Sequence, residues 1–239
     1  MSPIVEKLAA LRAEISESAI KAGRDPSSVE LIAISKTHPP HIIQEAIDAG
    51  QLIFGENRVQ EARAKIPLLP SKARWHLVGH LQKNKIRHAL PLFDLFHGVD
   101  SLELARDINR IAGEMGLFPK ILLEVNVADE ATKFGFKPDM LRAEIGEVLT
   151  LDRVQIEGLM TIAPIVEEPE DARQYFAALR ELRDELQREA GAPLPHLSMG
   201  MSSDFTAAIQ EGATMVRVGT AIFGPRSSKN LRAAESFTE

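Results

Sequence analysis

Short β-branched runs alternate with helical patterns from residue 29 almost to the end of the chain. This alternation limits the possible folds most strongly, because strands separated by helices pair in parallel. Eight such strand–helix units predict an α/β fold, a single (β/α)8 TIM barrel. An open doubly wound sheet has the same alternation, but no Gly-x-Gly-x-x-Gly motif accompanies these strands. The expected strands are Val29–Ser35, Gln51–Phe54, Trp75–Val78, Leu95–Val99, Lys120–Val127, Val154–Thr161, His196–Met199 and Thr214–Val218.

The segments between the expected strands carry helix signals. A helix at Pro40–Ala49 is followed by Gly50, a residue typical of the position just after a helix. Asp100 is the expected N-cap of a helix near Ser101–Glu114. Further helices are expected at Pro138–Leu149, Pro169–Ala190 and Ser203–Glu211.

An additional amphipathic helix precedes the first strand, and we expect it to pack outside the barrel. Its apolar positions recur at helical spacing and are Ile4, Leu8, Leu11 and Ile15. No linker, internal repeat or low-complexity segment interrupts the chain. Residues 1–226 are therefore predicted to form one barrel domain that includes this helix, and residues 227–239 a polar tail.

The composition excludes several classes of function. With 44% apolar and 26% charged residues the chain is typical of a soluble globular protein, and its net charge of −6 argues against nucleic-acid or membrane partners. The absence of cysteine excludes disulfides, thiolate zinc sites and a cysteine nucleophile. No run reaches the roughly 20 apolar residues of a membrane span, and no signal-peptide pattern is present. A cytoplasmic location is expected.

Lys36 closes the first strand, at the end where barrel enzymes place their chemistry. Strand alternation puts it on the same face as Ile32 and Ile34, so its side chain is expected to point into the mouth of the barrel. Desolvation there favours the neutral amine, which forms imines. A lysine that extends from the rim into solvent is the alternative. Lys133, in a loop after another strand, is a competing amine.

Two turns rich in small and hydroxyl residues follow the seventh and eighth strands, where barrels often bind phosphate. Ser202, Gly219 and Thr220 are the natural donors in these turns, although serine and threonine there also serve as ordinary helix caps. A lysine and a phosphate-binding turn are the smallest set of groups that can bind pyridoxal 5′-phosphate (PLP), because the lysine forms the Schiff base and the turn binds the phosphate.

Arg217 lies just before the eighth turn and has three possible roles. It can face a phosphate, face the pyridine nitrogen of PLP, or form a salt bridge at the rim. Beside the permanent charge of an arginine, the pyridine nitrogen stays unprotonated, and the ring then stabilises carbanions poorly.

The histidines give no metal-binding pattern. His76 and His80 lie four residues apart, and His38 and His41 three apart, without a matching carboxylate cluster. We therefore expect no metal site.

Taken in order, six segments of the chain resemble the YggS/PROSC-type pyridoxal phosphate homeostasis proteins, and the resemblance spans roughly residues 5 to 226. Departures are minor: Arg58 stands where an aromatic residue is frequent, and His38 follows the Lys-Thr pair. The segments are Ile34–Thr37, Phe54–Asn57, Trp75–Gly79 with Leu81–Lys85, Gly158–Thr161, Leu197–Asp204 and Val216–Gly224.

The resemblance implies a fold type III PLP barrel, like the N-terminal domain of alanine racemase. It implies that Lys36 carries PLP as a Schiff base, that Arg217 faces the pyridine nitrogen and that Asn57 lies near the cofactor. The residues that it implies for the phosphate are Ser202, Gly219 and Thr220. Family members are described as regulators of vitamin B6 and amino-acid pools, without a settled enzymatic turnover.

Three functions follow from these residues. The first is a PLP-binding homeostasis protein without turnover, with PLP-requiring apoenzymes as possible recipients, present as a monomer or weak dimer. The second is a PLP-dependent amino-acid racemase, which needs an acid/base group on each face of the α-carbon. Alanine racemases take a tyrosine for the second face from another domain, whereas the only tyrosine here, Tyr175, falls in an expected outer helix. The third is a Schiff-base phosphosugar aldolase, which needs the same lysine and phosphate site but no cofactor.

Overall fold

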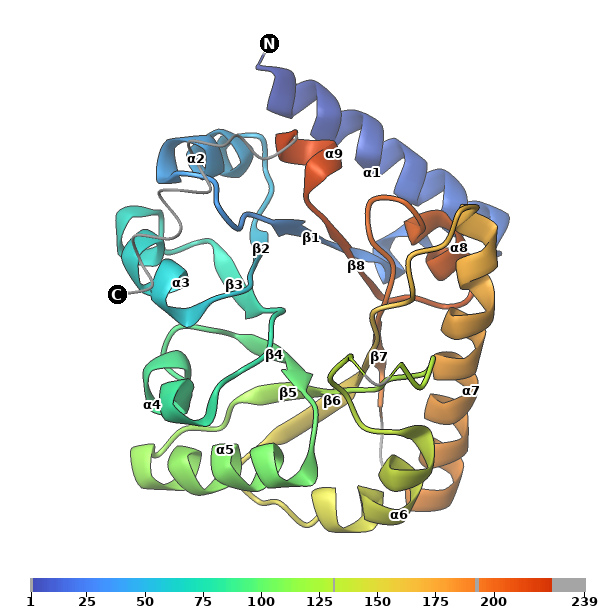
Figure 1. Cartoon of the computed structure of the whole chain (residues 1–239). Helices are drawn as coiled ribbons and strands as arrows, with labels where there is room; N and C mark the ends of the chain where they lie inside the picture. The colour runs from blue at the N-terminus through green and yellow to red at the C-terminus, as the bar shows by residue number, and fades with distance from the viewer. Residues whose placement is uncertain (1, 131, 192–193, 225–239) are drawn as a thin grey trace.

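The computed structural model describes residues 2–130, 132–191 and 194–224. Eight parallel strands close into a barrel in chain order, because the first strand pairs with both the second and the last (Figure 1). The predicted (β/α)8 barrel is confirmed, and the open doubly wound alternative is wrong. The strands are β1 (Glu30–Ile34), β2 (Ile53–Glu56), β3 (Arg74–Leu77), β4 (Leu95–Val99), β5 (Lys120–Glu124), β6 (Gln155–Met160), β7 (His196–Ser198) and β8 (Met215–Val218).

Helices follow the strands and surround the barrel (Figure 1). The α-helices are α1 (Pro3–Lys21), α2 (Pro40–Asp48), α3 (Val59–Lys65), α4 (Ile86–Ala89), α5 (Leu102–Met115), α6 (Pro138–Val148), α7 (Arg173–Ala190), α8 (Phe205–Gln210) and α9 (Thr220–Phe223). The 3₁₀ helices are η1 (Pro26–Ser28), η2 (Ile66–Leu68), η3 (Lys83–Lys85) and η4 (Pro169–Ala172).

The helix boundaries confirm the predicted glycine after α2 and correct the predicted N-cap of α5. Gly50 follows the C-cap of α2 with φ +81°, a left-handed conformation that favours glycine. The N-cap of α5 is Ser101 and not Asp100, because the Ser101 hydroxyl accepts the Leu104 N–H at 3.2 Å. The Asp100 carboxylate instead lies 2.9 Å from Nδ1 of His80.

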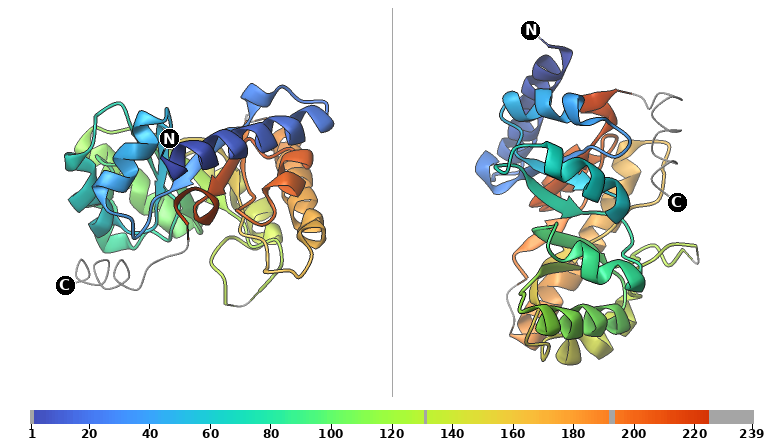
Figure 2. Two further views of the ribbon diagram at one scale, coloured as in Figure 1. Left: turned by 90° about the horizontal axis from the view of Figure 1, so that it is seen from above. Right: turned by 90° about the vertical axis from the view of Figure 1, so that its left-hand side faces the viewer.

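The N-terminal helix α1 packs outside the barrel, as predicted. It lies against α8, α9 and α2, and the right-hand view of Figure 2 shows it at the edge of the molecule. The four apolar positions that define the predicted amphipathic helix are buried: Ile4, Leu8, Leu11 and Ile15. Within the described ranges no helix is long and apolar enough to cross a membrane. The division of the chain at residue 226 stays a prediction, and the tail 227–239 lies outside the described residues.

The apolar core has two layers, and their arrangement sets the site. The larger layer lies between the strands and the outer helices. The smaller layer fills the inside of the barrel with Ile32, Ile53, Leu95, Leu122, Met160 and Met215. Nearer the carboxyl ends of the strands the interior becomes polar, with buried Glu124, Ser198 and Arg217. Buried polar side chains therefore lie at the end of the barrel where the sequence predicted the site.

Candidate functional site

A cavity of about 200 Å³ opens at the carboxyl ends of the strands. All six residues predicted from the sequence line it, together with apolar side chains that include Ile34 and Val78. They come from the turns after β1, β2 and β7 and from the end of β8 and its turn. The six residues are Lys36, Asn57, Ser202, Arg217, Gly219 and Thr220.

Lys36 follows β1 by two residues and contributes to the same cavity as Ile34. The alternation of side chains along β1 therefore places the lysine as the sequence predicted. The competing lysine Lys133 and the strand residue Lys120 both lie elsewhere. Lys120 opens β5, at the opposite end of the barrel, and its amine lies 3.1 Å from a Glu157 carboxylate oxygen. Lys133 forms an ion pair of 2.6 Å with Glu130 and does not line the cavity.

The turns after β7 and β8 present hydroxyl groups to the cavity. Ser202 and Thr220 are exposed, and neither hydroxyl has a hydrogen-bond partner among the described residues. The Met201 N–H donates to Oδ1 of the buried Asp204 at 2.6 Å, which fixes the first of these turns. A Cβ atom at Gly219 would lie 3.2 Å from the carbonyl oxygen of Ile34, so this turn packs tightly on β1. Two unpartnered hydroxyls beside a helix start make a donor set suited to an anion.

Arg217 is buried beneath the cavity and held in one orientation. Its guanidinium donates to the Ser198 carbonyl at 2.9 Å, to the Ser198 hydroxyl at 2.5 Å and to the Thr161 carbonyl at 2.7 Å. Since a guanidinium has five N–H donors, two are left for a ligand. Burial lowers the pKa of Arg217 to about 10, while Glu124 and Asp204 oppose this shift. The side chain is therefore a fixed cation at neutral pH.

Behind Arg217 a hydrogen-bonded chain runs through the barrel. Nδ1 of His97 lies 2.9 Å from the Ser198 hydroxyl, and Nε2 of His97 lies 3.0 Å from Nδ1 of His76. Because Arg217 donates to the Ser198 oxygen, the hydroxyl hydrogen is free to donate to His97, whose Nε2–H then donates to His76. Burial lowers the pKa of His76 to about 3 and that of His97 well below its ordinary value. Both imidazoles are neutral, so each contributes one N–H donor and one acceptor nitrogen to this chain of contacts.

His97 was not predicted from the sequence, in which the spacing of His76 and His80 suggested another pair. One signal was available, since alternation along β4 puts His97 on the inner face with Leu95. Within the described part of the chain, no group of three or more His, Asp or Glu side chains is arranged to hold a metal ion.

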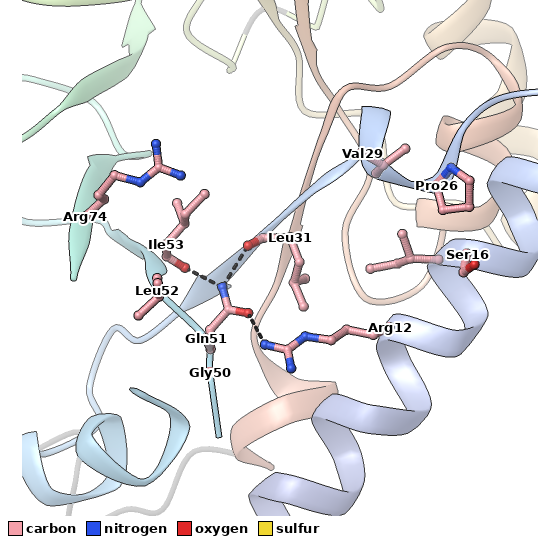
Figure 3. Close-up of a pocket in the computed structure, with 11 residues that line it drawn as sticks. Arg12, Ser16, Pro26, Val29, Leu31, Gly50, Gln51, Leu52, Ile53 and Arg74 are labelled. Carbon is pink, nitrogen blue, oxygen red and sulfur yellow. Dashed lines mark hydrogen bonds between the residues drawn. The ribbon is translucent and has the colours of Figure 1, made fainter. Parts of the chain in front are cut away.

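A larger cavity, about 360 Å³, lies at the amino-terminal end of the first strands and contains none of the six predicted residues (Figure 3). Gln51 organises it, donating to the carbonyls of Leu31 at 2.8 Å and Ile53 at 2.7 Å. Arg12 of α1 donates in turn to the Gln51 side chain at 3.3 Å. These bonds tie α1 to β1 and β2, so the residues at this end of the barrel serve the structure.

The fold and the site together define a class of protein: a barrel with an amine, anion donors and a buried arginine at the junction of its first and last strands. The family model for the N-terminal domain of alanine racemase matches residues 7–227. An alanine racemase from Clostridium difficile superposes with a TM-score of 0.72 at 18% identity, covering 96% of this chain and 58% of that chain, which shows the shared fold.

More similar proteins narrow the class. The "Pyridoxal phosphate homeostasis protein" of Aquifex aeolicus is 45% identical over 222 residues, covering 92% of this chain and 97% of the relative. PipY of Synechococcus elongatus, solved with PLP bound, has a TM-score of 0.82 at 46% identity and covers 92% of this chain and 100% of its own. This chain belongs to the family of pyridoxal phosphate homeostasis proteins.

Proposed function

We propose that this chain binds PLP in the cavity at the carboxyl ends of the strands and takes part in intracellular vitamin B6 and amino-acid homeostasis. One observation carries the proposal: the amine of Lys36, the hydroxyls of Ser202 and Thr220 and the guanidinium of Arg217 line a single cavity. The PLP-bound structure of PipY, 46% identical, supports it.

The donor set of the cavity fits PLP. Bound PLP supplies an aldehyde that condenses with primary amines, and the amine of Lys36 is the proposed attachment point. The open hydroxyls of Ser202 and Thr220, with the close turn at Gly219, suit the phosphate. The two remaining N–H donors of Arg217 suit an unprotonated ring nitrogen, and Asn57 is proposed to lie beside the ring.

We also propose that the protein holds and delivers PLP without enzymatic turnover. The relatives carry the name of homeostasis proteins. Tyr175, the only tyrosine of the sequence, lies in α7, which packs on the outside of the barrel. Racemisation needs a second acid/base group facing the ligand, and Tyr175 does not line the cavity. PLP-requiring apoenzymes as recipients, a monomeric or weakly dimeric state and a cytoplasmic location belong to the same proposal.

Replacing Lys36 tests the attachment point. Lys36→Ala should abolish PLP attachment that survives borohydride reduction while leaving the circular dichroism spectrum unchanged, because Lys36 is the only lysine among the described residues that line the cavity. Mass mapping of reduced wild-type protein should find the adduct on the peptide that contains Lys36. The matched control is Lys133→Ala, which should retain the adduct. An adduct that persists in the cavity of Lys36→Ala contradicts the assignment.

A further inference from the structure

The backbone next to Lys36 is strained. Thr37 has φ +67°, in the left-handed region, where a β-branched residue is unfavourable by about 1–3 kcal/mol. Such a conformation persists only when surrounding groups hold it. The side chains that hold it here come from β2 and α3.

Those side chains form a buried ionic triad of Glu56, Glu61 and Lys65. The Lys65 amine lies 3.0 Å from Oε1 of Glu56 and 2.5 Å from Oε1 of Glu61. The side chains are 0%, 4% and 6% exposed for Glu56, Glu61 and Lys65 respectively. None of the three lines the ligand cavity, so the proposed binding of PLP does not use them directly.

Every triad member contacts the backbone or side chain of a residue adjacent to Lys36. The Lys65 amine donates to the Ser35 carbonyl at 2.9 Å. The Ser35 hydroxyl donates to Oε1 of Glu56 at 2.7 Å, and the Thr37 N–H donates to Oε1 of Glu61 at 2.5 Å. The residues before and after Lys36 are thus held by charge-assisted hydrogen bonds, which are about twice as strong as neutral ones.

The triad is not an efficient way to stabilise the folded protein. Two carboxylates share one cation, and burial raises the pKa of Glu56, an effect that Lys65 opposes and Glu61 reinforces. The second oxygen of Glu56 and the Thr37 hydroxyl are buried without a partner among the described residues. Apolar side chains of similar volume are often as stable as a buried ion pair, or more stable. The contacts of the triad therefore point to a role in geometry.

We propose that Glu56, Glu61 and Lys65 are positioning residues, which hold the backbone on both sides of Lys36 and thereby direct its amine into the cavity. The proposal rests on the proposed function in one respect, that Lys36 is the attachment point for PLP. A displacement of about 1 Å in a reacting group can slow a reaction by about 100-fold. Loss of the triad should therefore slow attachment without removing the cavity.

Two variants test the proposal. The first is Lys65→Met, which leaves two buried carboxylates and can fail to fold. The second is Glu61→Leu with Lys65→Met, which replaces the ion pair by apolar side chains that a core tolerates. The control is Lys21→Met, which breaks an exposed pair of the same spacing with Glu17. Conservative Glu61→Gln keeps an acceptor for the Thr37 N–H and should recover part of the wild-type rate.

The first measurement compares attachment with binding. In whichever variant folds, attachment of PLP, trapped by borohydride, should slow by about 10-fold to 100-fold. The affinity for pyridoxine 5′-phosphate, which lacks the aldehyde, should stay within about twofold of wild type. Attachment at the wild-type rate overturns the proposal, and so does equal loss of attachment and pyridoxine 5′-phosphate binding.

The second measurement is independent of PLP. In ligand-free protein the Thr37 amide should lose its protection against hydrogen exchange in the double variant and keep it in Lys21→Met. Unchanged protection overturns the positioning role even if wild-type protein attaches no PLP to Lys36. If wild-type protein attaches no PLP but the Thr37 amide loses protection in the double variant, the proposed function is refuted. The effect of the triad on the backbone is then still supported.

Discussion

Removing the two open hydroxyls of the cavity should weaken PLP binding and leave the protein equally stable. A hydrogen bond to a charged group contributes about 1.5–3 kcal/mol, so Ser202→Ala with Thr220→Val should remove roughly 3–6 kcal/mol of binding free energy. That range corresponds to roughly a 10²-fold to 10⁴-fold rise in Kd. Both residues are exposed and neither hydroxyl bonds to a described residue, so unfolding free energy should change by less than about 0.5 kcal/mol.

The assay compares two vitamers. Competition or fluorescence titration measures Kd for PLP and for pyridoxal, which lacks the phosphate, in a Lys36→Ala background that excludes covalent attachment. Only the affinity for PLP should fall. The matched control is Ser203→Ala, the adjacent exposed hydroxyl, which does not line the cavity. Equal losses for both vitamers, or an equal loss in the control, would refute the assignment of these hydroxyls to the phosphate.

Two further predictions concern pH and catalysis. Burial, reinforced by Asp100 and opposed by Arg217, raises the pKa of Glu124 from 4.5 to about 7. A folded pKa above the unfolded value means that wild-type protein loses stability as pH rises through this window, by up to about 3 kcal/mol. Glu124→Gln should lack this loss, so urea unfolding at pH 5 and pH 8 should show a weaker pH dependence, and an unchanged dependence would contradict the burial argument. With L-amino acids in deuterated water, PLP-loaded protein should exchange the α-hydrogen slowly, because the proposed contact of Arg217 would keep the ring nitrogen unprotonated. Configuration should be retained, because Lys36 would deprotonate and reprotonate from one face. Rapid exchange with inversion, seen by NMR and chiral chromatography, would restore the racemase hypothesis.

The parts of the site that a single strand or turn encodes were predictable. Alternation along β1 gave the inward face of Lys36, and small residues after the last two strands marked Ser202 and Thr220. These inferences need only local periodicity and the rule that barrel sites lie at carboxyl strand ends. The six predicted residues line one cavity for that reason.

Contacts across the barrel were not predictable in the same way. His97 meets Ser198 across 101 positions of sequence, and the contact depends on the stagger of the strands around the closed barrel. The short helix α3, which supplies Glu61 and Lys65, was not predicted from the sequence. The capping error at α5 has a local cause, since Asp100 and Ser101 both suit a cap and Asp100 instead contacts His80.

The pairing of β1 with β8 has a consequence for how the protein is made. Lys36 follows the first strand of the barrel in chain order, whereas Arg217 and the turn at Gly219 belong to the last strand and the turn after it, which are synthesised later. The cavity does not exist until the final strand closes against the first, so a nascent chain has no place for the vitamin. A ligand that contacts residues of both β1 and β8 joins the two ends of the barrel. At a ligand concentration of 100 times Kd, binding stabilises the closed barrel by about 2.7 kcal/mol. A ligand bound across this pair of strands would therefore stabilise the closed barrel more as its concentration rises.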